Sequence, residues 1–158
     1  MIRFSQAALK KVDELRSKYS TKEACLLPIL HLAQKEFGYV SLEAMEYIAE
    51  LIDISPAKVY GVATFYIMYN RKPIGKYHIQ VCKNISCNLS GSEDVFKEIK
   101  SILKIDKGET TKDNMFTLSA VECLGACGFG PVVQINDDYH EQITKDKIRE
   151  IIEELKKK

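Results

Sequence analysis

The sequence has no excess of charge of one sign. It contains 23 Lys and Arg residues against 22 Asp and Glu, which gives a formal net charge of +1. Proteins that bind nucleic acid or anionic membrane surfaces through phosphates carry a strongly positive field, so neither is expected as a partner. The composition, 46% hydrophobic and 28% charged over 158 residues, is typical of a globular protein with one ordinary domain or two small ones.

Long apolar runs are also missing. No segment approaches the ~18 apolar residues that a membrane-spanning helix needs, so direct membrane insertion is not expected. The first twenty residues carry charges where a secretion signal would need an apolar stretch. We therefore expect a cytoplasmic location, which allows a place at the periphery of a membrane-attached complex.

Several common catalytic motifs are absent. The sequence has no G-x-G-x-x-G, no phosphate-binding P-loop and no H-E-x-x-H, and no Ser/His/Asp arrangement can be argued. Nucleotide, flavin and zinc-protease chemistry therefore have no visible site, and we expect no catalytic residues and no substrate site on this chain.

Five cysteines are present, and four of them form two close pairs. Cys82 and Cys87 are separated by four residues, and Cys123 and Cys127 by three, with 35 residues between the pairs. An odd number of cysteines without a secretion signal makes a disulfide framework unexpected. Cys25 lies alone in the apolar run ACLLPIL, where a small buried hydrophobe is the simplest interpretation.

The periodicity predicts an α+β chain in two parts. Residues 1–72 show helical spacing of apolar side chains, with a last helix expected from Ser55–Pro56 to about Tyr69. The segment NRKPIG at 70–75 marks a boundary. Residues 73–158 then predict a strand ending on Cys82, a helix, a strand ending on Cys123, a hairpin and a final helix that begins near Thr144.

This order has a consequence for the cysteines. Two strands joined by a helix are most often parallel neighbours. The two cysteine pairs then meet at the carboxyl edge of one sheet, where open α/β sheets place their ligands.

Four converging thiolates allow three functional interpretations. A [2Fe–2S] cluster takes two thiolates on each iron, and the apolar residues and glycines near the pairs suit it; the expected shield consists of Ile85, Leu89, Leu124 and Phe129. Structural zinc also accepts four thiolates but mostly uses C-x2-C spacing. Thiol–disulfide chemistry favours C-x-x-C, which neither pair has. Four unrelated buried cysteines are the remaining alternative.

Three segments carry a resemblance to a known family. They are VCKNISCNLSG (81–91), ECLGACGFGPVVQIND (122–137) and GVATFYIMY (61–69). Together they resemble the 24-kDa, or E, subunit of NADH:quinone oxidoreductase. They equally resemble the small subunit of NAD(P)-linked, sometimes electron-bifurcating, hydrogenases and formate dehydrogenases.

The resemblance implies a helical N-terminal domain, 1–72, followed by a thioredoxin-like [2Fe–2S] ferredoxin domain, 73–158. It implies that one [2Fe–2S] cluster has four ligands, Cys82, Cys87, Cys123 and Cys127. It further implies an oxidoreductase subunit that exchanges single electrons with a larger partner carrying the flavin (FMN) and NAD(H). The alternatives are a zinc-stabilised interaction module without a redox role and a free-standing ferredoxin.

The other chemically capable side chains have simpler interpretations. His31, His78 and His140 stand alone in three predicted elements, and structural or surface roles are expected for them. An aromatic group near the end of the fourth helix (Tyr60, Phe65, Tyr66 and Tyr69) is interpreted as core packing, with a docking surface for a larger subunit as the alternative.

Overall fold

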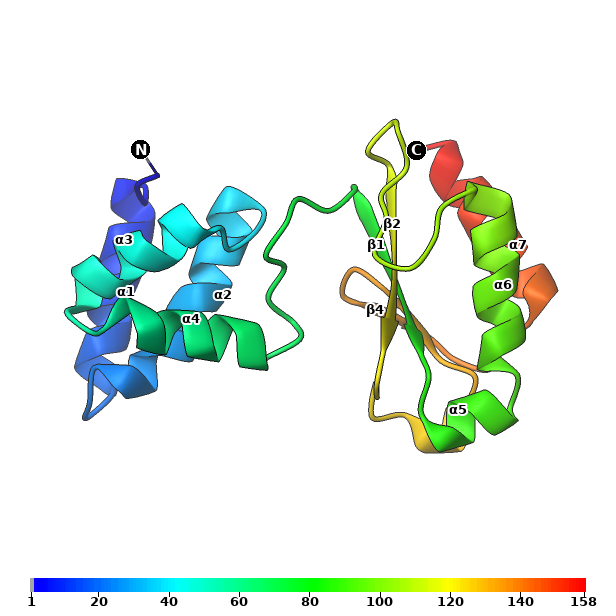
Figure 1. Ribbon diagram of the computed structural model, residues 1–158, viewed down its shortest axis with the longest axis horizontal. Coiled ribbons are helices and arrows are strands. Elements are labelled where there is room, and N and C mark those ends of the chain that lie inside the picture. The colour runs from blue at the N-terminus through cyan, green and yellow to red at the C-terminus, as the bar shows by residue number, and fades with distance from the viewer. Residues whose placement is uncertain (1) are drawn as a thin grey trace. The chain divides into compact units, whose positions relative to one another are not determined.

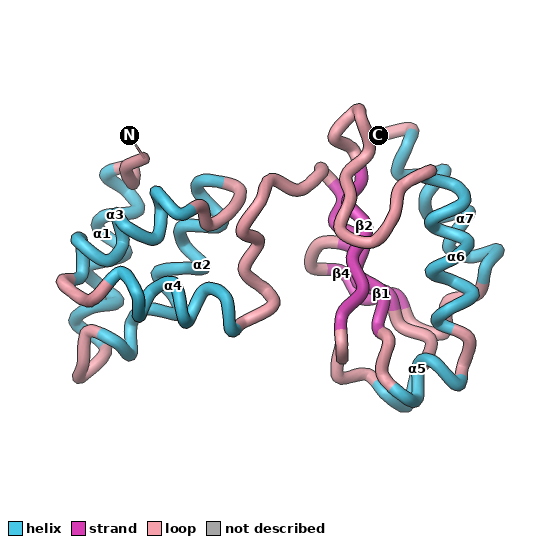
Figure 2. Tube along the Cα trace, viewed as in Figure 1, coloured by secondary structure: helices cyan, strands magenta, loops and turns pink. Residues whose placement is uncertain are grey.

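The computed structural model describes residues 2–158, and the chain divides into two compact units, Met1–Pro73 and Ile74–Lys158. Figure 1 shows the course of the chain, and Figure 2 shows that the described strands all lie in the second unit. The fold is the predicted one, a helical N-terminal part followed by a mixed α/β part. Among the described residues, no helix has the length and apolarity needed to cross a membrane.

The first unit is a helical bundle. Its elements are α1 (Gln6–Lys18), the short 3-10 turn η1 (Glu23–Cys25), α2 (Leu26–Phe37), α3 (Leu42–Ile52) and α4 (Pro56–Phe65). Serine side chains cap α1 and α3: Ser5 accepts the Ala8 amide, and Ser41 accepts the Ala44 amide. The apolar faces of the helices form one core around fully buried side chains such as Ile29, Leu30 and Ile48.

Helix α4 ends earlier than the sequence predicts. Its last residue is Phe65, and Tyr66 already has an extended backbone. The chain then returns to the bundle, because the Tyr69 hydroxyl donates to the Leu27 carbonyl (2.9 Å) and the Val40 amide donates to the Asn70 carbonyl (2.7 Å). These tertiary hydrogen bonds outweigh the helical propensity of the last predicted turn.

The second unit is a four-stranded sheet with two long helices. The elements are β1 (Tyr77–Cys82), α5 (Ile85–Leu89), α6 (Ser92–Leu103), β2 (Phe116–Val121), η2 (Cys127–Phe129), β3 (Val133–Ile135), β4 (Asp138–His140) and α7 (Lys145–Lys156). The strand order is β2-β1-β3-β4. β1 and β2 are parallel, as predicted, and the hairpin β3–β4 continues the sheet in antiparallel fashion.

Helices α6 and α7 cover one face of the sheet (Figure 1). Alternation along β1 sends Ile79 and Val81 into the core between the sheet and these helices, together with Leu118 of β2 and Ile99 of α6. The alternate residues of β1, His78 and Gln80, therefore point to the opposite face. Cys82 shares that orientation at the end of the strand.

Candidate metal centre

The first cysteine pair is buried at the carboxyl end of β1. Cys82 is the last residue of the strand, and its amide donates to the Val132 carbonyl (3.1 Å). The Lys83 amide donates to the Val121 carbonyl (2.9 Å), after which the chain leaves the sheet. Asn84 then caps α5 by accepting the Ile85 amide, and one turn later Cys87 points inward. The side chains of Cys82 and Cys87 are 3% and 2% exposed.

The second pair lies in the loop after β2, and both of its thiols are exposed. The sequence predicts that β2 ends on Cys123, but the strand ends at Val121, opposite Cys82 in register. The earlier end follows from β1, since a strand cannot pair beyond the point where its neighbour turns away. Cys123 therefore lies two residues past the strand, and Cys127 begins η2, which packs against α5.

The loop between Cys123 and Cys127 turns its backbone toward sulfur. Gly125 has a φ of +76°, a conformation that glycine adopts without strain. Its amide donates to the Cys123 Sγ at 3.3 Å. An amide directed at sulfur stabilises negative charge on a thiolate ligand.

The surroundings of Cys87 disfavour its thiolate form. Burial, and next the hydrogen bond with Cys82, raises the pKa of the Cys87 thiol, and the nearby Cys127 raises it further. A positive charge beside the sulfur, such as a metal ion supplies, favours the deprotonated form of such a thiol.

Small and apolar groups close the inner side of the site. Val132, fully buried, packs with Cys82 and Cys87, and Leu124 and Ala126 lie against them. Of the four residues predicted to shield the cluster, only Leu124 packs against the buried cysteines. Ile85, Leu89 and Phe129 are 74%, 85% and 52% exposed and do not pack in the cluster around the buried cysteines, so their shielding role stays a prediction. The periodicity of so short a helix and loop does not reveal which side faces inward.

The donor set suits a binuclear iron–sulfur centre. Within residues 2–158 no three His, Cys, Asp or Glu side chains are grouped around a single point as ligands of one ion. The four thiols instead form one buried and one exposed pair on adjacent loops, and a [2Fe–2S] cluster takes one pair of thiolates on each iron.

The remaining residues singled out by the sequence lie elsewhere in the fold. Cys25 is fully buried, and its thiol donates to the Lys22 carbonyl (2.9 Å). The His31 ring packs on Tyr69, with ring centroids 5.0 Å apart. His78 pairs with the Ser119 hydroxyl at 2.8 Å, and burial lowers the pKa of its imidazole.

The aromatic group divides between core and surface. Tyr69 is buried, as core packing requires, whereas Tyr60, Phe65 and Tyr66 are exposed and lie beside the exposed Ile67 and Met68.

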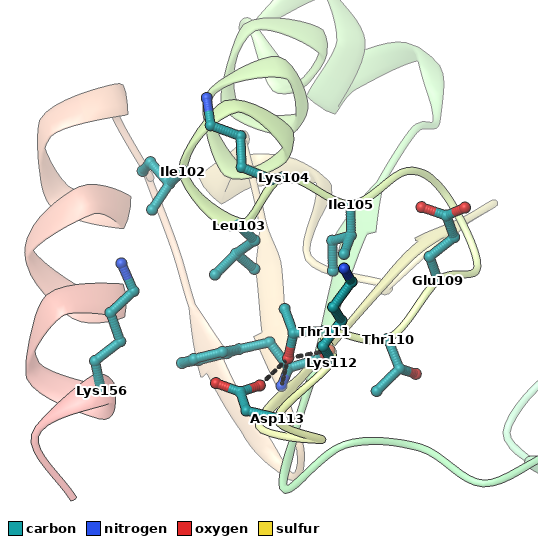
Figure 3. A pocket seen from close by; sticks show the side chains of 11 residues that line it. Ile102, Leu103, Lys104, Ile105, Glu109, Thr110, Thr111, Lys112, Asp113 and Lys156 are labelled. Carbon is teal, nitrogen blue, oxygen red and sulfur yellow. Dashed lines mark hydrogen bonds between the residues drawn. The ribbon is translucent and has the colours of Figure 1, made fainter.

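A separate cavity of about 760 Å³ lies at the other end of the second unit, near the start of β2 (Figure 3). The residues that line it include Leu103, Lys112 and Phe116. The Asp113 carboxylate accepts hydrogen bonds from the Thr111 hydroxyl and the Met115 amide (3.0 Å), so it is turned to its own loop. No cysteine lines this cavity, and it is distinct from the metal centre.

Tyr139 makes a hydrogen bond with the cysteine loop that the sequence did not suggest. Its hydroxyl donates to the Leu124 carbonyl at 2.9 Å, although the two residues are 15 positions apart. The sequence carries no spacing signal for this contact, because it depends on where the β3–β4 hairpin lies relative to the cysteine loop.

Comparison with known proteins agrees with this architecture. A family model described as thioredoxin-like [2Fe-2S] ferredoxin matches residues 12–156. The E subunit of NADH-quinone oxidoreductase from Rickettsia conorii is 46% identical over 155 residues, 96% of this chain and 93% of the relative. A second relative, one of the E subunits of NADH-quinone oxidoreductase from Rhizobium meliloti, is 38% identical over 147 residues, 93% of this chain and 88% of the relative.

A solved structure extends the similarity to the fold. An NAD+-reducing [NiFe]-hydrogenase in its H2-reduced state matches 84% of this chain with a TM-score of 0.73 and 20% identity. This chain spans only 22% of that hydrogenase chain, and at this identity the match concerns the fold alone.

Proposed function

Because the chain belongs to the thioredoxin-like [2Fe-2S] ferredoxin family, we propose that it is an electron-transfer subunit whose cluster is held by two thiolate pairs, Cys82 with Cys87 and Cys123 with Cys127. The observation that supports this most directly is the placement of both pairs at or just beyond the carboxyl ends of two adjacent parallel strands. A [2Fe–2S] cluster supplies a centre that gains and loses one electron at a time.

The residues of the chain have separate tasks in this function. The buried pair, with Val132 behind it, excludes water from the inner side of the site. The exposed pair leaves the outer side open to a partner. No acid or base is needed, because an electron carrier has only to place the centre near its donor and to set its potential through hydrogen bonds and burial.

The donor in this proposal is a flavin on a larger partner that also binds NAD(H), within an NADH dehydrogenase or an NAD-linked hydrogenase. Support comes from the curated relatives, which are named as subunits of NADH-quinone oxidoreductase. The surroundings of the cysteines also fit a lasting contact. Residues 84–92 and 123–136 contain no Asp, Glu, Lys or Arg, and Ile85, Leu89 and Phe129 are exposed there.

Apart from the flanking Lys83 and Glu122, these segments offer little charge for the electrostatic steering on which transient encounters depend. We therefore expect the chain to co-purify with its flavoprotein from the native cell and to remain bound in high salt. A chain that purifies alone, or that leaves its partner when salt is raised, would favour the free-standing ferredoxin.

The cluster itself is tested by anaerobic purification with iron and sulfide analysis. The protein should be red-brown, should contain iron and acid-labile sulfide in equal amounts, and should give an EPR signal on reduction. Cys123→Ala and Cys127→Ala should lose this signal; both side chains are exposed, so their removal leaves the core intact. Cys25→Ala is the matched control and should keep the full spectrum. A colourless protein with stoichiometric zinc contradicts the proposal and favours the zinc-stabilised module.

A further inference from the structure

The Tyr139 hydroxyl reaches the cysteine loop from a distant part of the chain. Tyr139 lies in β4, paired with Gln134 of β3, and its side chain is about half exposed. The hydroxyl donates to the carbonyl of Leu124, the residue that directly follows Cys123. Tyr139 thus ties the hairpin to the exposed cysteine pair by a side-chain hydrogen bond.

The accepting carbonyl belongs to the same peptide unit as the amide that faces sulfur. The Leu124 C=O and the Gly125 N–H lie at opposite ends of one planar peptide bond. Tyr139 O–H donates to one end at 2.9 Å, and the other end donates to the Cys123 Sγ at 3.3 Å. Fixing the carbonyl therefore also fixes the direction of the N–H.

The same contact strengthens the donor. A hydrogen bond accepted by a peptide carbonyl polarises the amide and makes its N–H a better donor, since hydrogen bonds in a chain reinforce one another. Farther along, backbone hydrogen bonds hold the loop to the segment after β4. The Gln142 amide donates to the Phe129 carbonyl (2.8 Å), and the Ile143 amide donates to the Pro131 carbonyl (3.0 Å). The Leu124 peptide is the part of the loop that is held by a side chain, so its anchor can be removed by mutation.

We propose that Tyr139 is a positioning residue that aims the Gly125 amide at the Cys123 sulfur and so raises the reduction potential of the cluster. The inference rests on the proposed function, because it takes Cys123 as a ligand. Amide donors to ligand sulfur stabilise the more negative, reduced state. Loss of the tyrosine hydroxyl therefore makes reduction less favourable.

The test is a redox titration of anaerobically purified Tyr139→Phe, followed by EPR. The potential should become more negative, by up to about a tenfold change in the reduction equilibrium constant, which is about 59 mV for one electron. Tyr77→Phe is the matched control. Tyr77 lies in β1 of the same unit, its ring packs on Phe116, and no hydrogen bond of its hydroxyl is seen in the described structure. The control should keep the wild-type potential.

A second measurement reports on the loop directly. Amide hydrogen exchange, followed by mass spectrometry on the peptide that contains 123–127, should be faster in Tyr139→Phe than in the wild type and the control. Loss of iron from a folded Tyr139→Phe protein, with Tyr77→Phe fully loaded, also supports the positioning role.

Two results would overturn the inference, and they are distinguishable. If iron-loaded Tyr139→Phe has the wild-type reduction potential and unchanged amide hydrogen exchange, Tyr139 has no positioning role, and the proposed function is unaffected. A wild-type protein without iron, or a Cys123→Ala variant with an unchanged cluster, removes the proposed function and this inference with it.

Discussion

Gly130 lies close to the buried half of the cysteine site. A Cβ at this position would lie 3.2 Å from the Ser90 Oγ and 3.3 Å from the Cα of Cys87. The glycine therefore allows the loop after η2 to pack directly on the α5 backbone that carries Cys87. Backbone of this kind shifts less readily than the tip of a flexible side chain.

Gly130→Ala should lower the free energy of unfolding by about 1–2 kcal/mol, because the added methyl group overpacks a close contact. It should also lower the iron content, since the Cα of Cys87 has to move. Denaturant unfolding and iron analysis measure the two effects. Gly128→Ala is the control, because a Cβ there meets nothing within 4 Å. Equal stability and iron content in the two variants would contradict this prediction.

His78 is a second residue whose environment has a measurable consequence. Burial lowers the pKa of its imidazole below the ordinary value near 6.5, so the folded protein holds the ring neutral in a range where the unfolded chain binds a proton. The associated stability is complete above pH 6.5 and is lost as the pH falls from there toward the lowered pKa of the folded state.

The free energy of unfolding should therefore fall between pH 7 and pH 5 more steeply in the wild type than in His78→Gln. Denaturant titrations of both proteins across this range measure the difference. Parallel pH profiles would show that His78 does not contribute to the acid sensitivity of the fold.

At the scale of elements, the cysteine site depends on the close parallel pairing of β1 and β2. Gly75 precedes β1, and a Cβ on it would lie 2.8 Å from the Phe116 amide nitrogen and 2.9 Å from the Met115 carbonyl carbon. The start of β1 therefore approaches the backbone of β2 more closely than any side chain allows. At the other end of the same two strands lie the cysteines.

Gly75→Ala should lower the free energy of unfolding by about 2–3 kcal/mol, because backbone on both sides of the contact has to separate. Gly61→Ala is the matched substitution in the first unit. Gly61 lies inside α4 with nothing near its added Cβ, so the change should raise stability by up to about 1 kcal/mol. Thermal and denaturant unfolding of the two variants should give effects of opposite sign, and effects of the same sign would contradict this account.

At the scale of the whole molecule, each unit has its own core. The apolar side chains of the helical bundle and those between the sheet and its helices form separate clusters. We propose that the two units are independent domains, the second of which contains all four cluster cysteines.

A fragment of residues 74–158 should therefore fold by itself and bind iron and sulfide as the full chain does. Circular dichroism, thermal unfolding and iron analysis check this expectation. A fragment of residues 1–73, tested in the same way, should be helical and free of iron. An unfolded 74–158 fragment would show that the second core depends on the first unit.

The sequence by itself determined the order of the long helices and of the strands, and the edge of the sheet near which both cysteine pairs lie. Apolar periodicity gives the helices, alternation gives β1, and the helix between the two strands favours the parallel pairing that places Cys82 and Val121 side by side. These are local signals, so they can be read without the fold.

Only the tertiary structure decided where elements stop and which side chains close the site. β2 ends at Val121 because β1 turns away at Cys82, and α4 ends at Phe65 because the following residues bond back to α2 and to Val40, between α2 and α3. Val132, rather than the exposed Leu89, lies behind the buried cysteines. Tyr139 reaches Leu124 only because the hairpin lies beside the cysteine loop. Such contacts join residues that are distant in the chain, and no local pattern specifies them.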